Sequence, residues 1–220
     1  MSFELAENEV IGLIGPNGSG KTTMINLISG ALLPSGGSIR LYNDDITQES
    51  ATNISRLGIA RTFQIVRILP TLSVLENVAA GGIFGHERRW GRHLESAARQ
   101  MLRRVGLEGA EKSPVSALTY IDQKRLELAR ALLSNPRVLL LDEWLAGLNP
   151  TELLTGIALI EELRAEGRTI IVVEHVMDAI RSLCDRCVVM NSGAKIAEGT
   201  TSEVLAEEAV IQAYLGDDHA

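Results

Sequence analysis

The chain carries, at residues 15–22, the sequence Gly15-Pro16-Asn17-Gly18-Ser19-Gly20-Lys21-Thr22. It matches the pattern G-x-x-x-x-G-K-[ST] in full, after a short apolar run and before a helical pattern, which is the context that the motif requires. The glycines let successive backbone N–H groups and a helix N-terminus approach phosphate oxygens. This placement favours a nucleoside triphosphate site over a glycine-rich turn with a solvated lysine. The expected contacts come from Gly15, Pro16, Asn17, Gly18, Ser19, Gly20, Lys21, Thr22 and Thr23.

Two carboxylates complete this candidate site. Asp142 and Glu143 follow the apolar run 138–141, and ligands bind at the carboxyl ends of strands in open α/β sheets. We expect Lys21 to reach the β- and γ-phosphates, Thr22 to ligate Mg²⁺ and Asp142 to orient the Mg²⁺ shell. Glu143 is expected to polarise the attacking water as a general base. An acidic pair after a strand often caps a helix instead, but its combination with the glycine-rich loop favours catalysis.

Apolar runs that alternate with helical patterns predict an α/β fold with buried parallel strands and right-handed crossovers. Gly81, Gly82 and Gly85 are expected to break the helix that begins at Val74, and a basic loop is expected around residues 86–92. The middle of the chain, near residues 68–134, is predicted to be a mostly helical insertion. Periodicity predicts strands at 10–15, 38–42, 58–62, 138–141 and 169–173, and helices at 22–29, 74–80, 94–105 and 122–134.

Composition restricts the class of protein. The chain has 220 residues, with 28 acidic and 21 basic side chains and a net charge of −7, which argues against a nucleic-acid binder that neutralises phosphates. The apolar fraction of 45% excludes a disordered chain. Apolar runs such as 138–141 and 170–173 are far shorter than the roughly 20 residues that span a bilayer. With no signal-like N-terminus, we expect a cytoplasmic globular protein or a subunit of a larger assembly.

The two cysteines form a CxxC pattern, Cys184-Asp185-Arg186-Cys187. This pattern occurs in redox pairs and in zinc sites, but no second CxxC or paired histidines follow it. We expect two small buried thiols where a helix leads into a strand.

With these motifs and four further stretches, the chain resembles the nucleotide-binding subunit of an ABC transporter over nearly its whole length. The resemblance implies a P-loop NTPase (RecA-like) core of residues 1–67 and 135–220, with a parallel sheet and a C-terminal helical tail. It implies an inserted α-helical subdomain, residues 68–134, that carries a signature-like loop. The four stretches are Phe63-Gln64, which resembles the Q-loop, residues 126–132 after the signature, residues 147–150 at the D-loop, and Val172-Val173-Glu174-His175 at the switch histidine.

The resemblance also implies roles for individual residues. Gln64 would touch Mg²⁺ and the attacking water, and His175 would contact the γ-phosphate, so the catalytic set is Glu143, His175 and Gln64. ATP and Mg²⁺ are the implied cofactors, with Thr22, Gln64 and Asp142 near the metal, partly through water. Thr119, in the signature-like loop, would contact the ATP of the opposite subunit.

The implied partners follow from the same family. They are a second ATP-binding subunit, identical or a paralogue, two transmembrane permease subunits and, indirectly, a periplasmic or extracytoplasmic solute-binding protein, with no nucleic acid. Such a subunit works peripherally at the cytoplasmic face of the cell membrane. Residues 58–64, 72–78, 146–150 and 213–216 are similar to subunits that energise the import of branched-chain or other hydrophobic amino acids, or of related amides such as urea.

The chain departs from the family pattern in its signature and at its start. Leu118-Thr119-Tyr120-Ile121-Asp122 stands for Leu-Ser-Gly-Gly-Gln. Tyr120 and Ile121 add bulk where the backbone is expected to approach closely, and a positive φ would be strained at the β-branched Ile121. At about 8 Å and an effective dielectric constant near 20, Asp122 would repel a phosphate by about 2 kcal/mol. Only 14 residues precede Gly15, so N-terminal strands and an adenine-stacking aromatic residue are expected to be missing, and weak nucleotide affinity is predicted.

Three alternatives remain open. The changed signature is either a tolerated variant or the mark of a degenerate half of a heterodimer that binds ATP but hydrolyses little. A soluble ABC-type ATPase of repair or translation is a rival class, although the second cassette or coiled-coil arms usual there are not seen. The basic loop at residues 88–93 is either a solvated surface or a contact for an anionic bilayer or membrane subunit.

Trp144 replaces the proline that usually follows the catalytic glutamate.

Overall fold

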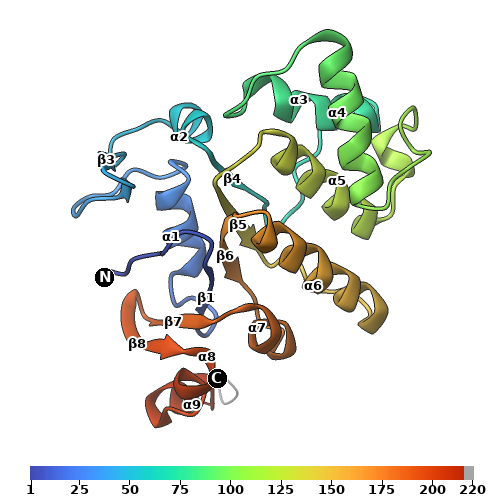
Figure 1. Ribbon diagram of the computed structural model, residues 1–220. Helices are drawn as coiled ribbons and strands as arrows, with labels where there is room; N and C mark the ends of the chain where they lie inside the picture. The colour runs from blue at the N-terminus through green and yellow to red at the C-terminus, as the bar shows by residue number, and fades with distance from the viewer. Residues whose placement is uncertain (216–220) are drawn as a thin grey trace. The chain divides into compact units, whose positions relative to one another are not determined.

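The computed structural model describes residues 1–215, so Gly216 of the similar stretch 213–216 and the last residues of the expected core lie outside the described residues. The contacts of the chain define two compact units (Figure 1). Unit 1 comprises Met1–Asn26 and the chain from Leu140 onward, and unit 2 comprises Leu27–Leu139. Within residues 1–215, no helix combines the length and the apolar character needed to cross a membrane.

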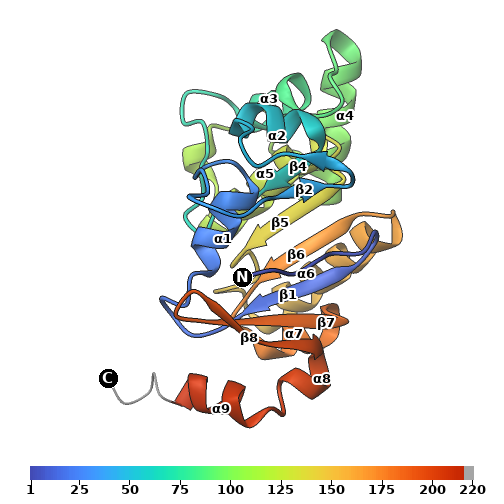
Figure 2. The same cartoon turned by 90° about the vertical axis from the view of Figure 1, so that its left-hand side faces the viewer.

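Unit 1 is built on a mixed sheet. β1 pairs in parallel with β6 and with β7, whereas β7 and β8 form an antiparallel pair. Every residue of β1 and β6 is buried, as expected for parallel strands that are covered on both faces. Figure 2 shows the arrowheads of β1, β5 and β6 at one edge of the sheet. In spatial order the strands are β5 (Val138–Asp142), β6 (Thr169–Val173), β1 (Val10–Ile14), β7 (Arg186–Asn191) and β8 (Ala194–Thr200).

Local signals set the helix ends in unit 1. α1 (Lys21–Ile28) begins directly at the end of the glycine-rich loop. α6 (Pro150–Ala165) begins with a capping box, in which the side chain of Asn149 accepts from Glu152 N and the Glu152 carboxylate accepts from Asn149 N. The remaining helices of this unit are α7 (Met177–Leu183), α8 (Thr201–Val204) and α9 (Glu208–Leu215).

Three helices pack against one another in unit 2: α3 (Val74–Phe84), α4 (Gly91–Arg104) and α5 (Tyr120–Leu133) (Figure 1). β4 lies beside the start of β5, because the carbonyl of Gly58 accepts from Arg137 N and Val138 N. The smaller elements of the unit are the antiparallel pair β2 (Arg40–Leu41) and β3 (Asp44–Asp45), α2 (Ala51–Leu57), β4 (Ile59–Arg61) and a 3₁₀ turn at Val115–Ala117.

The predicted α/β alternation is confirmed, but three local predictions were wrong. Gly81 and Gly82 do not break α3, which ends at Phe84. The glycines serve close packing instead, since a Cβ at Gly81 would lie 2.0 Å from the carbonyl oxygen of Arg130 on α5. The strand expected at 38–42 is only two residues long, because Tyr42 turns the chain with a φ of 55°. α4 and α5 begin at Gly91 and Tyr120, earlier than their apolar periods indicated.

Candidate functional site

The glycine-rich loop in unit 1 is tightly folded between β1 and α1. Gly15, Gly18 and Gly20 have φ values of 145°, 75° and 104°, which glycine adopts without strain. A Cβ at Gly15 would lie 2.0 Å from the carbonyl oxygen of Met190. Backbone from β7 therefore packs directly against the first residue of the loop, and only glycine fits there.

Lys21 folds back into this loop. Its side chain is buried, and Nζ donates to the carbonyl oxygens of Gly15 at 2.7 Å and Pro16 at 2.8 Å. Thr22 and Thr23, at the N-terminus of α1, are exposed. The loop thus offers a cation, hydroxyl groups and the positive end of a helix dipole on one side, an arrangement that suits an anion such as phosphate.

A residue from the end of the described chain also contacts the loop. Gly15 N donates to the hydroxyl of Tyr214 on α9 at 2.8 Å. Burial raises the pKa of Tyr214, so this hydroxyl stays neutral and keeps a proton of its own to donate. The sequence marked residues 213–216 only as a family-like ending, and nothing in it indicated a contact with residue 15.

The two acidic residues lie at the carboxyl end of β5. Asp142 is buried, at 2% exposure. Glu143 has a φ of 51°, a left-handed conformation that is uncommon outside glycine. Glu143 N donates to Val173 O at 2.8 Å, and Nε2 of His175 lies 3.0 Å from Glu143 Oε1. The structure thus brings together two of the three predicted catalytic side chains, from the ends of β5 and β6.

Glu174 supports this turn and was not singled out from the sequence. It is 1% exposed, and its Oε1 accepts from Leu145 N at 2.5 Å. The only signal in the sequence was an acidic residue at the end of an apolar strand. Trp144 lies between Glu143 and Leu145 in the sequence. Its ring packs on α6, with Cζ3 3.2 Å from the position that a Cβ would take at Gly156. The bulky ring thus fits because residue 156 has no side chain.

Gln64 and Thr119, the other predicted site residues, belong to unit 2. Gln64 is exposed in the loop after β4. Thr119 is the N-cap of α5, where its hydroxyl accepts from Asp122 N at 3.2 Å and donates to Asp122 Oδ2 at 2.9 Å. Asp122 Oδ1 is 3.1 Å from a guanidinium nitrogen of Arg125. This ion pair offsets part of the repulsion that an isolated Asp122 carboxylate would exert on a phosphate.

The strain expected in the signature-like loop is absent. Tyr120 and Ile121 lie in the first turn of α5. Neither is among the residues with positive φ in the described chain. The prediction was wrong because it took the glycines of the family pattern as a sign of positive φ, whereas the helix starts here directly after its cap.

The cysteines are free and buried, as predicted, at the end of α7 and in β7. Their hydrogen bond, together with burial, raises the pKa of Cys184, and the same bond lowers the pKa of Cys187 to about 7. Across residues 1–215, no group of histidine, cysteine or acidic side chains is arranged to hold a metal ion.

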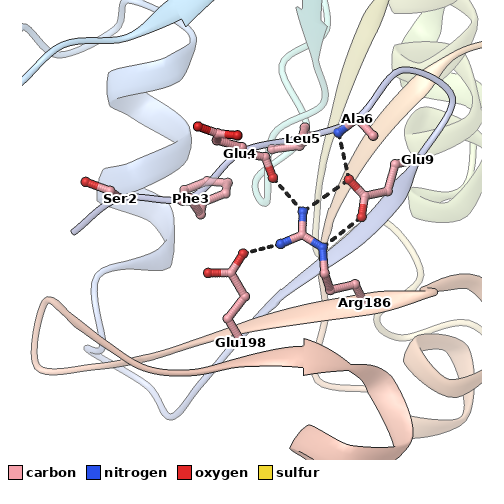
Figure 3. Close-up of a pocket in the computed structure, with 8 residues that line it drawn as sticks. All are labelled: Ser2, Phe3, Glu4, Leu5, Ala6, Glu9, Arg186 and Glu198. Atoms are coloured by element: carbon pink, nitrogen blue, oxygen red, sulfur yellow. Dashed lines mark hydrogen bonds and ion pairs between the residues drawn. The ribbon is translucent and has the colours of Figure 1, made fainter.

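An open cavity of about 640 Å³ lies under the N-terminal segment of unit 1 (Figure 3). At its centre Arg186 pairs with Glu9 at 2.8 Å and with Glu198, and donates to the carbonyl oxygen of Glu4. Burial alone would raise the pKa of Glu9, but the bonds from Arg186 and from Ala6 N hold it below its usual value. These contacts fasten the N-terminal segment to β7 and β8.

The chain is similar to known proteins along its length. Residues 1–146 match the family described as "ABC transporter", and residues 194–220 match "Branched-chain amino acid ATP-binding cassette transporter". The high-affinity branched-chain amino acid transport ATP-binding protein LivG of Salmonella typhimurium is 39% identical, over 99% of this chain and 91% of its own length. BraF of Pseudomonas aeruginosa, with the same description, is 37% identical over the same shares. The lipopolysaccharide export system ATP-binding protein LptB of Escherichia coli is 32% identical, over 99% and 90%.

The structure is also similar to solved structures of ATP-binding cassettes. The ADP conformation of MJ1267, an ATP-binding cassette of an ABC transporter, superposes with a TM-score of 0.86 at 30% identity, over 98% of this chain and 91% of that one. A dimeric post-hydrolysis structure of the ATP-binding cassette MJ0796, bound to ADP and Pi, gives a TM-score of 0.82 at 27% identity, over 90% and 88%.

Proposed function

Because the chain belongs to the ATP-binding subunits of the ABC transporter family, we propose that it hydrolyses ATP to drive the import of branched-chain or other hydrophobic amino acids, or of related amides. The observation that supports ATP hydrolysis is the contact between His175 Nε2 and Glu143 Oε1, which lies in the same unit as the glycine-rich loop. The relatives LivG and BraF, which are named for branched-chain amino acid transport, support the choice of solute.

ATP would be held by residues 15–23, through the backbone N–H groups of all of them except Pro16, which has none, and through the ammonium of Lys21. The ammonium of Lys21 now bonds to two loop carbonyls, and it would exchange these for β- and γ-phosphate oxygens. The exchange is favourable because a charged acceptor forms a stronger hydrogen bond with an ammonium than a neutral carbonyl does.

The oxygen donors of unit 1 fit Mg²⁺, because the Thr22 hydroxyl and the Asp142 carboxylate offer the oxygen ligands that this hard cation prefers. The Gln64 amide of unit 2 would supply a further oxygen ligand. Bound Mg²⁺ would neutralise charge on the β- and γ-phosphates. Asp142, buried at the end of β5, would hold its oxygens in place for that purpose.

Glu143 would accept the proton of the attacking water. Glu143 is held at two points: its backbone N–H donates to Val173 O in β6, and its side-chain Oε1 contacts His175. His175 would thereby orient the base and, with its ring near the γ-phosphate, stabilise charge in the transition state. The buried Glu174 would fix the following turn through Leu145 N.

We also propose the assembly. Two ATP-binding subunits would enclose two ATP molecules, with Thr119 of each contacting the ATP of the other, at the cytoplasmic face of the membrane. Residues 68–134 would act as the helical subdomain that contacts the permease subunits, with a solute-binding protein on the other side. The dimeric ADP- and Pi-bound structure of MJ0796 supports the dimer.

One observation favours the alternative of a degenerate half in a heterodimer. The Thr119 hydroxyl already donates to Asp122 Oδ2, so it must give up that bond to reach a phosphate. A subunit with this signature would bind its own ATP through its own glycine-rich loop and would cap its partner's ATP weakly.

Reconstitution tests the proposal. The chain and its co-purified membrane subunits are placed in proteoliposomes with the solute-binding protein, and ATP-dependent uptake of radiolabelled leucine, urea and glutamate is compared. The proposal predicts leucine or urea uptake that Glu143→Gln abolishes, whereas Glu161→Gln, at an exposed carboxylate on α6, leaves it unchanged. Uptake of glutamate alone, or hydrolysis that survives Glu143→Gln, would contradict it.

A further inference from the structure

A single buried carboxylate in unit 2 holds both sides of the loop that contains Gln64. Glu127, on α5, is 2% exposed. Its Oε2 accepts from Phe63 N at 3.0 Å, and its Oε1 accepts from Arg67 N at 2.8 Å. Gln64 lies between these two bonded residues. The loop 62–69, hereafter the Gln64 loop, is therefore anchored to α5 on both sides of its functional residue.

Arg130, one turn further along α5, completes the anchor. Its guanidinium is 3.5 Å from Glu127 Oε1 and donates to the carbonyl oxygen of Arg67. Burial raises the pKa of Glu127 and lowers that of Arg130, because loss of water disfavours the charged form of each side chain. Buried ion pairs of this kind contribute little to stability, and in some proteins they fix one arrangement of the chain. Here that arrangement is the path of the Gln64 loop.

Two further contacts fasten the same loop. Asn77 of α3 is fully buried; its Oδ1 accepts from Leu69 N at 2.8 Å and its Nδ2 donates to Leu69 O at 3.0 Å. Nearer the functional residue, the hydroxyl of Tyr120 donates to Gln64 O at 3.3 Å. Tyr120 directly follows Thr119, so this bond links the signature-like start of α5 to Gln64 itself.

We propose that Glu127 is a positioning residue that makes the Gln64 loop and α5 move as one body, so that Gln64 and Thr119 change place together. The inference rests on the proposed function, which assigns Gln64 to the subunit's own ATP and Thr119 to the opposite ATP. A carboxylate is required because the two amides need two acceptor oxygens. Glutamine offers one oxygen and would turn an NH₂ group toward the other amide.

Hydrogen exchange of the purified chain without nucleotide tests the anchor directly. In Glu127→Gln, the amide of Phe63 or Arg67 should exchange at least tenfold faster. In the matched control Glu95→Gln, both amides should exchange at the wild-type rate. Tyr120→Phe, which keeps the ring and loses only the hydroxyl, should speed exchange in the Gln64 loop about twofold to fivefold. If neither variant changes exchange there, the anchor does not exist and the proposal falls.

Kinetics of the assembled transporter separate positioning from a merely structural role. Glu127→Gln should lower kcat tenfold or more with the KM for ATP within twofold of wild type. Faster exchange with an unchanged kcat would overturn the positioning role. If Glu127→Gln does not fold, Tyr120→Phe decides by the same two readouts. Failure of the proposed function is distinguishable, because wild type would then show no transport-coupled hydrolysis while the exchange result would still stand.

Discussion

The left-handed backbone at Glu143 makes a quantitative prediction about stability. With a φ of 51°, a residue that carries a Cβ pays about 1–2 kcal/mol relative to glycine. Glycine loses about 0.5–1 kcal/mol through its greater freedom in the unfolded chain. Glu143→Gly and Glu143→Ala both remove the carboxylate and the contact with His175, so these losses cancel in the comparison. We expect Glu143→Gly to be more stable than Glu143→Ala by about 0.5–1 kcal/mol.

Urea unfolding followed by tryptophan fluorescence measures this difference. Trp144 is 5% exposed next to the site, and Trp90, in unit 2, is 62% exposed, so a Trp90→Phe background reports on unit 1. Glu161, an exposed residue of α6 in unit 1, is the control, where the glycine variant should be less stable than the alanine variant by about 1 kcal/mol. If the glycine variant at residue 143 is less stable than the alanine variant, as expected at the helix control, the argument is refuted. Both variants at residue 143 should lose ATP hydrolysis.

Three further predictions concern other contacts. Gly81→Ala should destabilise the chain by about 1–3 kcal/mol in urea unfolding, since its Cβ would meet the backbone oxygen of Arg130; an unchanged midpoint would contradict this packing. Tyr214→Phe removes the acceptor of Gly15 N and should weaken ATP binding up to about fivefold in a titration, the equivalent of about 1 kcal/mol; unchanged affinity would show that the contact is irrelevant to the nucleotide. Burial raises the pKa of Glu127 above its usual value, so the folded state binds its proton more tightly, and the stability of wild type relative to Glu127→Gln should fall as pH rises from the usual pKa through the raised one; a rise would contradict it.

Local sequence signals were sufficient to predict the glycine-rich half of the candidate site. The glycine-rich loop and its flanking strand and helix form as predicted, because their conformations depend on glycine and on short-range hydrogen bonds. Asp142 and Glu143 also lie where a strand end places them. No periodicity in the sequence brings residues 143 and 175 together. Only the resemblance to the family assigned both to one catalytic set, and the contact between His175 and Glu143 agrees with it.

The remaining features depend on contacts that are distant in the sequence. Gly81 remains helical because α5 packs against it, and helix propensity alone does not include that neighbour. Glu127 appeared only as a polar residue within the helix after the signature, and its partners are backbone amides of residues 63 and 67. Backbone donors leave no trace in side-chain patterns, so such an anchor is found only from coordinates.

The most direct test of the ATPase assignment is sedimentation of Glu143→Gln with and without ATP, after titration has established that nucleotide binds. The substitution keeps the shape of the side chain and removes the general base, so ATP can no longer be hydrolysed to reopen the closed state. The account predicts a monomer without ATP and a stable dimer with it, because Thr119 of each subunit would contact the ATP of the other. An ATP-bound monomer would contradict a homodimeric ATPase and would favour a degenerate half that needs a different partner.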